Sequence, residues 1–225
     1  SAQPAARCWA WLHPCAPARS AAAGALSSEP LMSLTLITPP AVEPITLAEA
    51  RAQCRIDGTE EDALLSIYIG AARSRAENET GRRLITQTWR QTLDEFPAVG
   101  DIRLEVPKPQ SISQVQYLDA NGVWQTLPPS EYVLDAATGP SGWLYPADGT
   151  SWPTTKALAN AVRIDIVAGY GTAPSDVPDD IRHWMLLQIE YDYQQRGAID
   201  STGRATSIPG RYVDGKLDPH RIYGL

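Results

Sequence analysis

The spacing of apolar residues changes its period twice along this chain, and no other feature limits the fold as strongly. From about residue 46 to residue 82, apolar side chains recur at the three- and four-residue spacing of a helix. From Leu84 to Ile166 they alternate with polar residues, as in strands with one buried face, and helical spacing returns after Pro178. The sequence therefore predicts an α+β fold, in which an antiparallel β module is inserted between two parts of a helical core.

Both ends of the first helical stretch carry clear signals. Thr46 and Glu49 have the spacing of a capping box, in which hydroxyl and carboxylate each satisfy a backbone donor, and this predicts a helix to about Arg55. Thr59 is expected to cap a second helix that stops at Gly81. The apolar stripe expected on this helix consists of Leu64, Ile67, Tyr68, Ala71 and Ala72. The charged residues expected to lie mostly in solvent are Arg73, Arg75, Glu77 and Glu79.

The alternating region predicts several short antiparallel strands. Asn121-Gly122 supplies the positive φ angles of a tight hairpin between two of them. A β module inserted between two parts of one core must have its two ends close together. Strands are expected at residues 85–93, 102–106, 112–118, 123–127, 131–134, 143–145 and 162–166.

A third helix is expected to begin at Pro178 and to end at Gly197. It is apolar over most of its circumference, which indicates packing on several sides or a contact between subunits. The candidates for such a subunit contact are Trp184, Leu187 and Tyr191.

The C-terminal residues 199–225 are too rich in glycine and proline for a long helix, yet they carry large apolar side chains. We interpret them as an arm that becomes ordered on a partner. The candidate partner-binding residues of this arm are Tyr212, Leu217, Ile222, Tyr223 and Leu225.

Residues 1–31 are dominated by Ala, Ser and Pro and show no sustained period, so we expect an unstructured or non-native extension. Met32 is the first methionine and directly precedes the patterned sequence, which suggests the hypothesis that it is the natural initiator. The division expected from the sequence is an extension (1–31), a helical core (32–83 plus 172–198), a β-rich insertion (84–171) and a C-terminal arm (199–225).

Charge and composition exclude several classes of protein. The formal net charge of −7 lacks the basic footprint of a protein that grips nucleic acid over a broad face. No apolar run is long enough for a membrane span. Cys8, Cys15 and Cys54 form no disulfide framework, and Cys8, His13 and Cys15 offer three metal ligands without a fourth nearby.

No catalytic or cofactor motif is present in the sequence. Gly169-Tyr170-Gly171 lacks the third glycine and the Gly-Lys-Ser/Thr signature of phosphate-binding loops, so it is expected to form a plain turn. Acidic pairs such as Asp179-Asp180 fall where the positive end of a helix dipole explains them. We therefore expect no enzyme, no metal and no cofactor.

Three tryptophans leave an alternative open. Trp124, Trp143 and Trp152 lie among strands and turns, where exposed aromatic rings could stack on a ligand. This alternative describes a carbohydrate- or peptide-binding β module carried on helices.

The order of the segments, rather than any single motif, carries a resemblance to a known family. Between about residues 36 and 196, the chain resembles the head-tail connector (adaptor) proteins of tailed bacteriophages, which are also found in prophages and gene transfer agents. The segments that carry the resemblance are the capped helix at 46–55, Glu60-Glu61-Asp62-Ala63-Leu64-Leu65, Glu79-Thr80-Gly81-Arg82, Gln87-Thr88-Trp89, Ala168-Gly169-Tyr170-Gly171 and Val177-Pro178.

The resemblance implies a structural protein of the neck of a virion or phage-like particle, made in the bacterial cytoplasm. Such proteins form a ring, usually of twelve subunits, which binds the portal and carries the stopper and the tail. The C-terminal segment commonly docks on the portal, and DNA passes through the ring without specific binding. An acidic chain suits such a channel, because negative walls repel phosphate.

Overall fold

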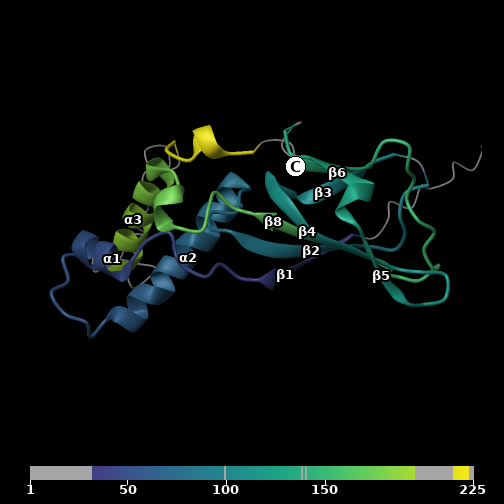
Figure 1. Cartoon of the computed structure of the whole chain (residues 1–225). Helices are drawn as coiled ribbons and strands as arrows, with labels where there is room; N and C mark the ends of the chain where they lie inside the picture. The colour runs from purple at the N-terminus through teal and green to yellow at the C-terminus, as the bar shows by residue number, and fades with distance from the viewer. Residues whose placement is uncertain (1–31, 99, 138, 140, 196–214, 223–225) are drawn as a thin grey trace, which may run out of the picture.

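The computed structural model describes residues 32–98, 100–137, 139, 141–195 and 215–222. Three α-helices occupy one end of an elongated molecule and two antiparallel sheets occupy the other (Figure 1). The α+β class expected from the sequence is confirmed. The elements are α1 Leu47–Cys54, α2 Asp62–Thr80, α3 Asp179–Gln194, β1 Ser33–Thr38, β2 Gln87–Leu93, β3 Ile102–Pro107, β4 Pro109–Leu118, β5 Trp124–Leu127, β6 Tyr132–Asp135, β7 Ser141–Pro146 and β8 Val162–Ala168.

Helix α1 begins as its sequence predicts. The Thr46 hydroxyl accepts the backbone N–H of Glu49 at 3.2 Å, and the Glu49 carboxylate accepts the backbone N–H of Thr46 at 2.8 Å. Helix α2 starts later than predicted: its N-cap is Glu61, with no side-chain cap, and Thr59 lies in the preceding turn. The carboxylate of Asp62 pairs with Arg51 of α1, so this acidic residue links two helices as well as facing the helix dipole.

The buried stripe of α2 differs from the predicted one by about one position. Leu65, Ile69, Ala72 and Ala76 are buried against the other helices, whereas Ile67 is 66% exposed. Both sets of residues have helical spacing, so periodicity alone cannot choose between them. Packing against α1 and α3 decides the face, and only Ala72 belongs to both stripes.

Helix α3 is the central element of the helical core. Ile181, Trp184, Met185 and Ile189 are fully buried in the cluster that also contains the buried residues of α2. Leu217, from the C-terminal segment, is fully buried in the same cluster. The predicted end of α3 at Gly197 lies outside the described residues.

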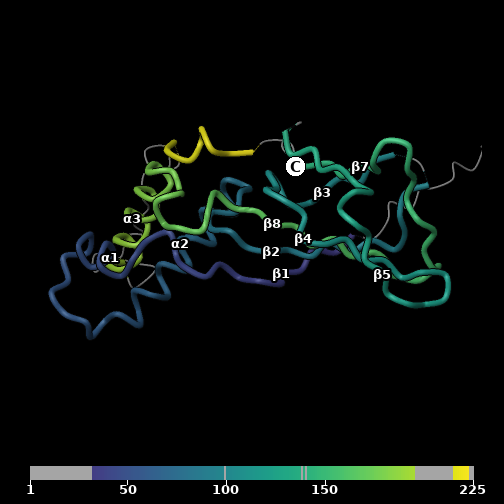
Figure 2. Tube along the Cα trace, in the orientation of Figure 1, coloured from purple at the N-terminus to yellow at the C-terminus, as the bar shows by residue number. Residues whose placement is uncertain are grey.

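The β end consists of two sheets that share one core. The first has the strand order β1-β2-β8-β4-β5, and the second has the order β3-β7-β6. Figure 2 shows the labelled strands of both sheets together, away from the helices. Leu104 and Val106 of β3 pack in one cluster with Ile164 and Ile166 of β8. The hairpin between β4 and β5 is confirmed, although only Gly122 in its loop has a positive φ, of 83°.

Strand β1 corrects the expected division of the chain. Residues 33–38 lie in the stretch assigned to the helical core, yet they pair with β2 at the edge of the five-stranded sheet, for example Ser33 with Thr92. Most side chains of β1 are exposed, so the buried alternating face that reveals a strand in sequence is missing.

The ends of the segment 84–171 lie side by side, as the insertion requires. The Thr86 N–H donates to Gly171 O at 2.9 Å, and the Tyr170 N–H donates to Leu84 O at 3.0 Å. Gly169 has a φ of 151°, and a Cβ there would lie 2.5 Å from the backbone nitrogen of Thr86. The glycine thus permits the close approach of two backbones. Gly169-Tyr170-Gly171 is therefore a turn at the junction between the helices and the sheets, which we call the waist.

Candidate functional site: joint and surfaces for assembly

No chemical centre is found in the described part of the chain. It contains no group of three or more His, Cys, Asp or Glu side chains arranged to hold a metal ion. No described helix has the length and hydropathy to cross a bilayer. Cys54 is half-buried, and burial raises the pKa of its thiol, with further raising by the charges of Glu190 and Glu61. Cys8, His13 and Cys15 lie outside the described residues, so the candidate functional regions are the internal joint and the surfaces.

Glu77 of α2 connects the helical end to the sheets by hydrogen bonds, and we call these contacts the joint. Its side chain is buried, and Oε1 accepts the backbone N–H of Leu84 at 3.1 Å and the amide of Gln87 at 2.9 Å. Its Oε2 lies 3.6 Å from Arg73 and 3.8 Å from Arg83. The expectation that Glu77 is solvated is wrong, because the segment that follows α2, from Arg83 to Gln87, lies against its side chain.

Arg83 reinforces this joint from the strand side. Its guanidinium lies over the ring of Trp89 in β2, at 4.3 Å from the centroid. Burial lowers the pKa of Arg83, and the charge of Glu77 raises it in part. The contact holds the connection between α2 and β2 against the face of the sheet.

A second polar cluster locks the centre of the five-stranded sheet. Asp165 of β8 is buried and accepts two hydrogen bonds from Arg90 of β2, at 2.7 and 2.8 Å, and one from Gln114 of β4 at 2.7 Å. Burial by itself raises the pKa of Asp165, but these hydrogen bonds and the charges of Arg90 and Arg163 outweigh it and leave the pKa below its ordinary value. The ionised carboxylate therefore ties three strands together.

The three candidates for a subunit contact on α3 lie in different environments. Trp184 is fully buried among helices of its own chain, with the guanidinium of Arg75 lying 5.7 Å from its ring centroid. Leu187 and Tyr191 are half-buried and remain at the surface of the described chain. The unusual apolar coverage of α3 is thus satisfied largely within the subunit.

The last described segment lies on the helical end instead of extending away from it. Leu217 is fully buried, and the N–H of Ile222 donates to Thr80 O at 2.9 Å. Arg82 donates to His220 O at 2.7 Å. Tyr212, Tyr223 and Leu225, the other predicted arm residues, lie outside the described residues.

An apolar hollow of about 410 Å³ opens on the surface of the helical end. It lies between the chain that enters α1 and the middle of α2, close in sequence to the 66% exposed Ile67. The sequence contained one indication of an apolar surface here: Ile67 belongs to the apolar stripe expected on α2, but the fold leaves it exposed. The apolar residues that line the hollow are Val42, Ile45, Leu47, Ile69 and Pro174.

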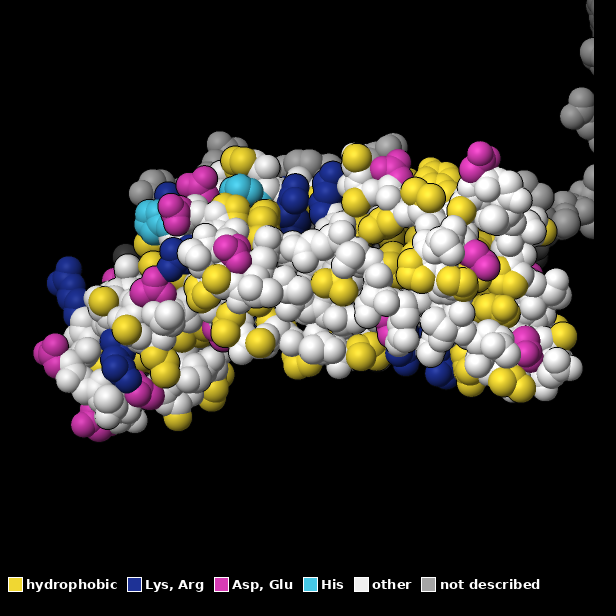
Figure 3. Space-filling view, in the orientation of Figure 1, with side chains coloured by type: hydrophobic (Ala, Val, Ile, Leu, Met, Phe, Trp, Pro, Cys, Tyr) yellow, Lys and Arg dark blue, Asp and Glu magenta, His cyan; other side chains and the backbone are white. Residues whose placement is uncertain are grey.

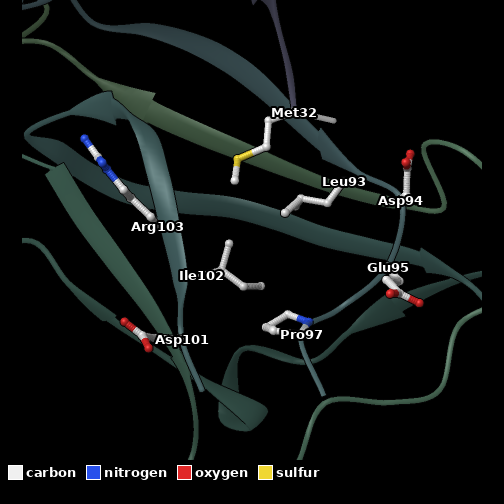
Figure 4. A pocket seen from close by; sticks show the side chains of 8 residues that line it. All are labelled: Met32, Leu93, Asp94, Glu95, Pro97, Asp101, Ile102 and Arg103. Carbon is white, nitrogen blue, oxygen red and sulfur yellow. The ribbon is translucent and has the colours of Figure 1, made fainter. Parts of the chain in front are cut away.

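A cleft of about 310 Å³ opens on the β end, beside β2 and β3 (Figure 4). Met32, Leu93, Pro97 and Ile102 supply apolar walls. The charged residues that line it are Asp94, Glu95, Asp101 and Arg103. Nothing in the sequence distinguished this cleft, because its walls come from three separate segments.

The three tryptophans of the alternative interpretation have different partners inside the chain. Trp152 stacks on Phe96 at 5.0 Å and donates to Gly100 O, while Trp124 lies under the guanidinium of Arg163 at 3.9 Å. Trp143 belongs to the other sheet, where β7 pairs with β3 and β6. No observation brings Trp124, Trp143 and Trp152 together into one surface on which a ligand could stack.

The conspicuous features of the described residues are therefore the apolar and charged surfaces and the polar contacts between the helices and the sheets. In a comparison with known protein families, residues 44–116 match the family of phage gp6-like head-tail connector proteins. The resemblance expected from the sequence is therefore confirmed, and the matched segment runs from the entry into α1 to β4. No curated protein sequence matches the chain.

Solved structures show that the likeness extends along the whole fold. A chain in the neck of an empty gene transfer agent (GTA) particle, computed with C6 symmetry, has a TM-score of 0.65 and 23% identity, with 86% of this chain and 97% of that chain covered. A chain in the virion of a native GTA particle has a TM-score of 0.66 and 22% identity, with 85% and 96% covered. A chain in the neck of a native GTA particle, computed with C12 symmetry, has a TM-score of 0.62 and 22% identity, with 86% and 97% covered.

Proposed function

We propose that this protein is a ring-forming head-tail connector in the neck of a phage-like particle. The observation that carries the proposal is the connector-family match over residues 44–116, together with a fold that covers nearly the whole length of neck chains from GTA particles. The role is structural and not enzymatic, in keeping with the matched family. The ring has twelve copies, in line with the C12 symmetry of one neck structure.

The ring contact joins two different faces of neighbouring copies. In a cyclic ring larger than a dimer, each subunit presents one surface to the copy before it and another to the copy after it. The apolar hollow beside α2 is one suitable surface at the helical end. Leu187 and Tyr191 on α3 remain the candidates from the sequence for the other surface.

The C-terminal residues 199–225 dock on the portal. Leu217 anchors this segment in the subunit's own core, which leaves Tyr212, Ile222, Tyr223 and Leu225 as the partner-binding candidates. The opposite side of the ring carries the stopper or the tail. DNA passes through the ring without specific binding, which the net charge of −7 favours because acidic walls repel phosphate.

A docking experiment with portal tests this proposal. Portal rings are mixed with the full chain, with Tyr212→Ala, with Tyr223→Ala, and with Lys156→Gln as a control at an exposed residue outside the arm and the proposed ring contact. Bound protein is measured by sedimentation. The wild type and Lys156→Gln are expected to co-sediment with portal, and the two tyrosine variants are expected to bind more weakly at unchanged Tm. If the tyrosine variants bind portal as strongly as the wild type, residues 199–225 do not dock on the portal. If the wild type does not bind portal, the chain is not a connector.

A further inference from the structure

We propose that a small basic hollow at the waist, lined by Arg82, Arg83, Lys108 and Tyr170, receives a carboxylate side chain from an adjacent copy of this chain. The hollow measures about 30 Å³ and is completed by Pro107 and Gly169. This inference rests on the proposed ring, because it needs a neighbouring copy.

Three separate parts of the fold line the hollow, and two of them supply its cations. Arg82 and Arg83 lie between α2 and β2, Lys108 lies between β3 and β4, and Tyr170 follows β8. Figure 3 shows Lys and Arg side chains next to each other between the helical end and the β end, with further Lys, Arg, Asp and Glu side chains on both ends. The hollow is therefore a feature of the folded chain that no single sequence motif reveals.

The positive charge of this hollow is poorly compensated. Within the described residues, the one carboxylate paired with any of the three cations is that of Glu77, at 3.8 Å from Arg83, and Glu77 is shared with Arg73. Arg82 and Lys108 donate instead to neutral backbone oxygens, those of His220 and Gly139, at 2.7 and 2.8 Å. The hollow therefore attracts an anion.

Two residues that line the hollow also carry a buried donor without an acceptor. Among the described residues, neither Nε of Arg83 nor the hydroxyl of Tyr170 has a hydrogen-bond partner. Burial raises the pKa of Tyr170, and the charge of Arg82 lowers it in part, so the hydroxyl stays protonated and is able to donate. Buried donors are nearly always paired in folded proteins, so an incoming oxygen atom would complete this site.

The size and charge of the site favour a protein carboxylate over DNA. Binding to a DNA backbone uses a row of cations along many phosphates, whereas this is one narrow hollow in an acidic chain. The chain carries 26 Asp and Glu residues against 19 Lys and Arg, so a neighbouring copy presents carboxylates in excess. Head-to-tail packing in a ring brings a different face of that copy against the hollow.

The test measures self-association of the full chain by sedimentation velocity over a range of concentrations and salt. The variants are Arg82→Gln and Lys108→Gln, and the matched control is Lys156→Gln, which removes an exposed lysine before β8. Each variant at the hollow is expected to weaken association at least about tenfold and to reduce its salt dependence, as loss of a charge-assisted contact predicts. The control is expected to match the wild type, and circular dichroism is expected to show an unchanged fold for all.

The outcomes separate this inference from the ring itself. If the wild type associates and both variants associate equally well, the carboxylate site is wrong while the ring stands. If the variants keep their association but lose affinity for duplex DNA, the hollow binds phosphate and the proposal is overturned. If the wild type stays monomeric, the proposed ring is refuted. Acetate titrated into the wild type then tests the hollow by itself. Unchanged NMR signals of Tyr170 in that titration would overturn the anion site.

Discussion

The joint at Glu77 yields the sharpest prediction about stability. In Glu77→Gln the remaining oxygen still accepts from Leu84 and Gln87, but these two bonds lose the strengthening that a carboxylate supplies. The new amide group also places a second set of donors toward Arg73 and Arg83. We expect a loss of about 2–3 kcal/mol in the free energy of unfolding, which is near the lower end for a buried ion pair because the arginines are partly exposed.

Thermal and chemical unfolding measure this loss directly. For a chain of this size, about 2–3 kcal/mol corresponds to a fall in Tm of roughly 4–12 °C. Hydrogen exchange at the Leu84 amide is expected to accelerate, because its acceptor is the altered group. The matched control is Glu79→Gln on the same helix, where the ion pair with Arg221 is more exposed and its loss costs about 0.5 kcal/mol. A Tm for Glu77→Gln equal to that of the control would refute the role of Glu77 as the joint.

Three further predictions follow from the fold. Gly169→Ala is expected to destabilise by at least about 2 kcal/mol, measured by urea unfolding, because its Cβ would meet fixed backbone. Asp165→Asn is expected to cost about 3 kcal/mol at neutral pH, since Arg90 loses its partner. Because the pKa of Asp165 is lowered on folding, its stabilising effect is present above its ordinary pKa of about 4, and the difference between wild type and variant shrinks as pH falls below that value. Leu217→Ala is expected to lower stability by about 2–5 kcal/mol, and an unchanged Tm would show that this segment does not belong to the core.

The parts of the fold that local chemistry determines could be predicted from the sequence. The capping box at Thr46 and Glu49 forms as expected, and the alternation at Ile102, Leu104 and Val106 corresponds to buried positions of β3. In these segments the residues that define the element are neighbours in sequence.

The parts that depend on distant contacts could not be predicted. Two overlapping helical stripes on α2 differ by about one position, and only packing against α1 and α3 selects the one with Leu65 and Ile69. The sequence around Glu77 predicts a surface residue, and only its contacts with Leu84 and Gln87 in the folded chain explain its burial. Leu217 follows a long broken segment, so nothing local indicates that it returns to the helical core.

The same reason limits what could be predicted of the candidate surfaces. The basic hollow combines residues from three connections that are far apart in sequence, and Arg82 and Lys108 carry no motif there. Tyr212, Tyr223 and Leu225 could be chosen only because large apolar residues are unusual in a segment rich in glycine and proline.

The central claim is that copies of this chain close into a ring on the portal, and native mass spectrometry of the chain mixed with purified portal rings measures this directly. The account predicts one dominant complex that carries a fixed, full set of copies, twelve if the symmetry matches that of the neck structure computed with C12 symmetry. A distribution of partially loaded portals without a preferred number, or portal rings that gain no mass, would contradict it.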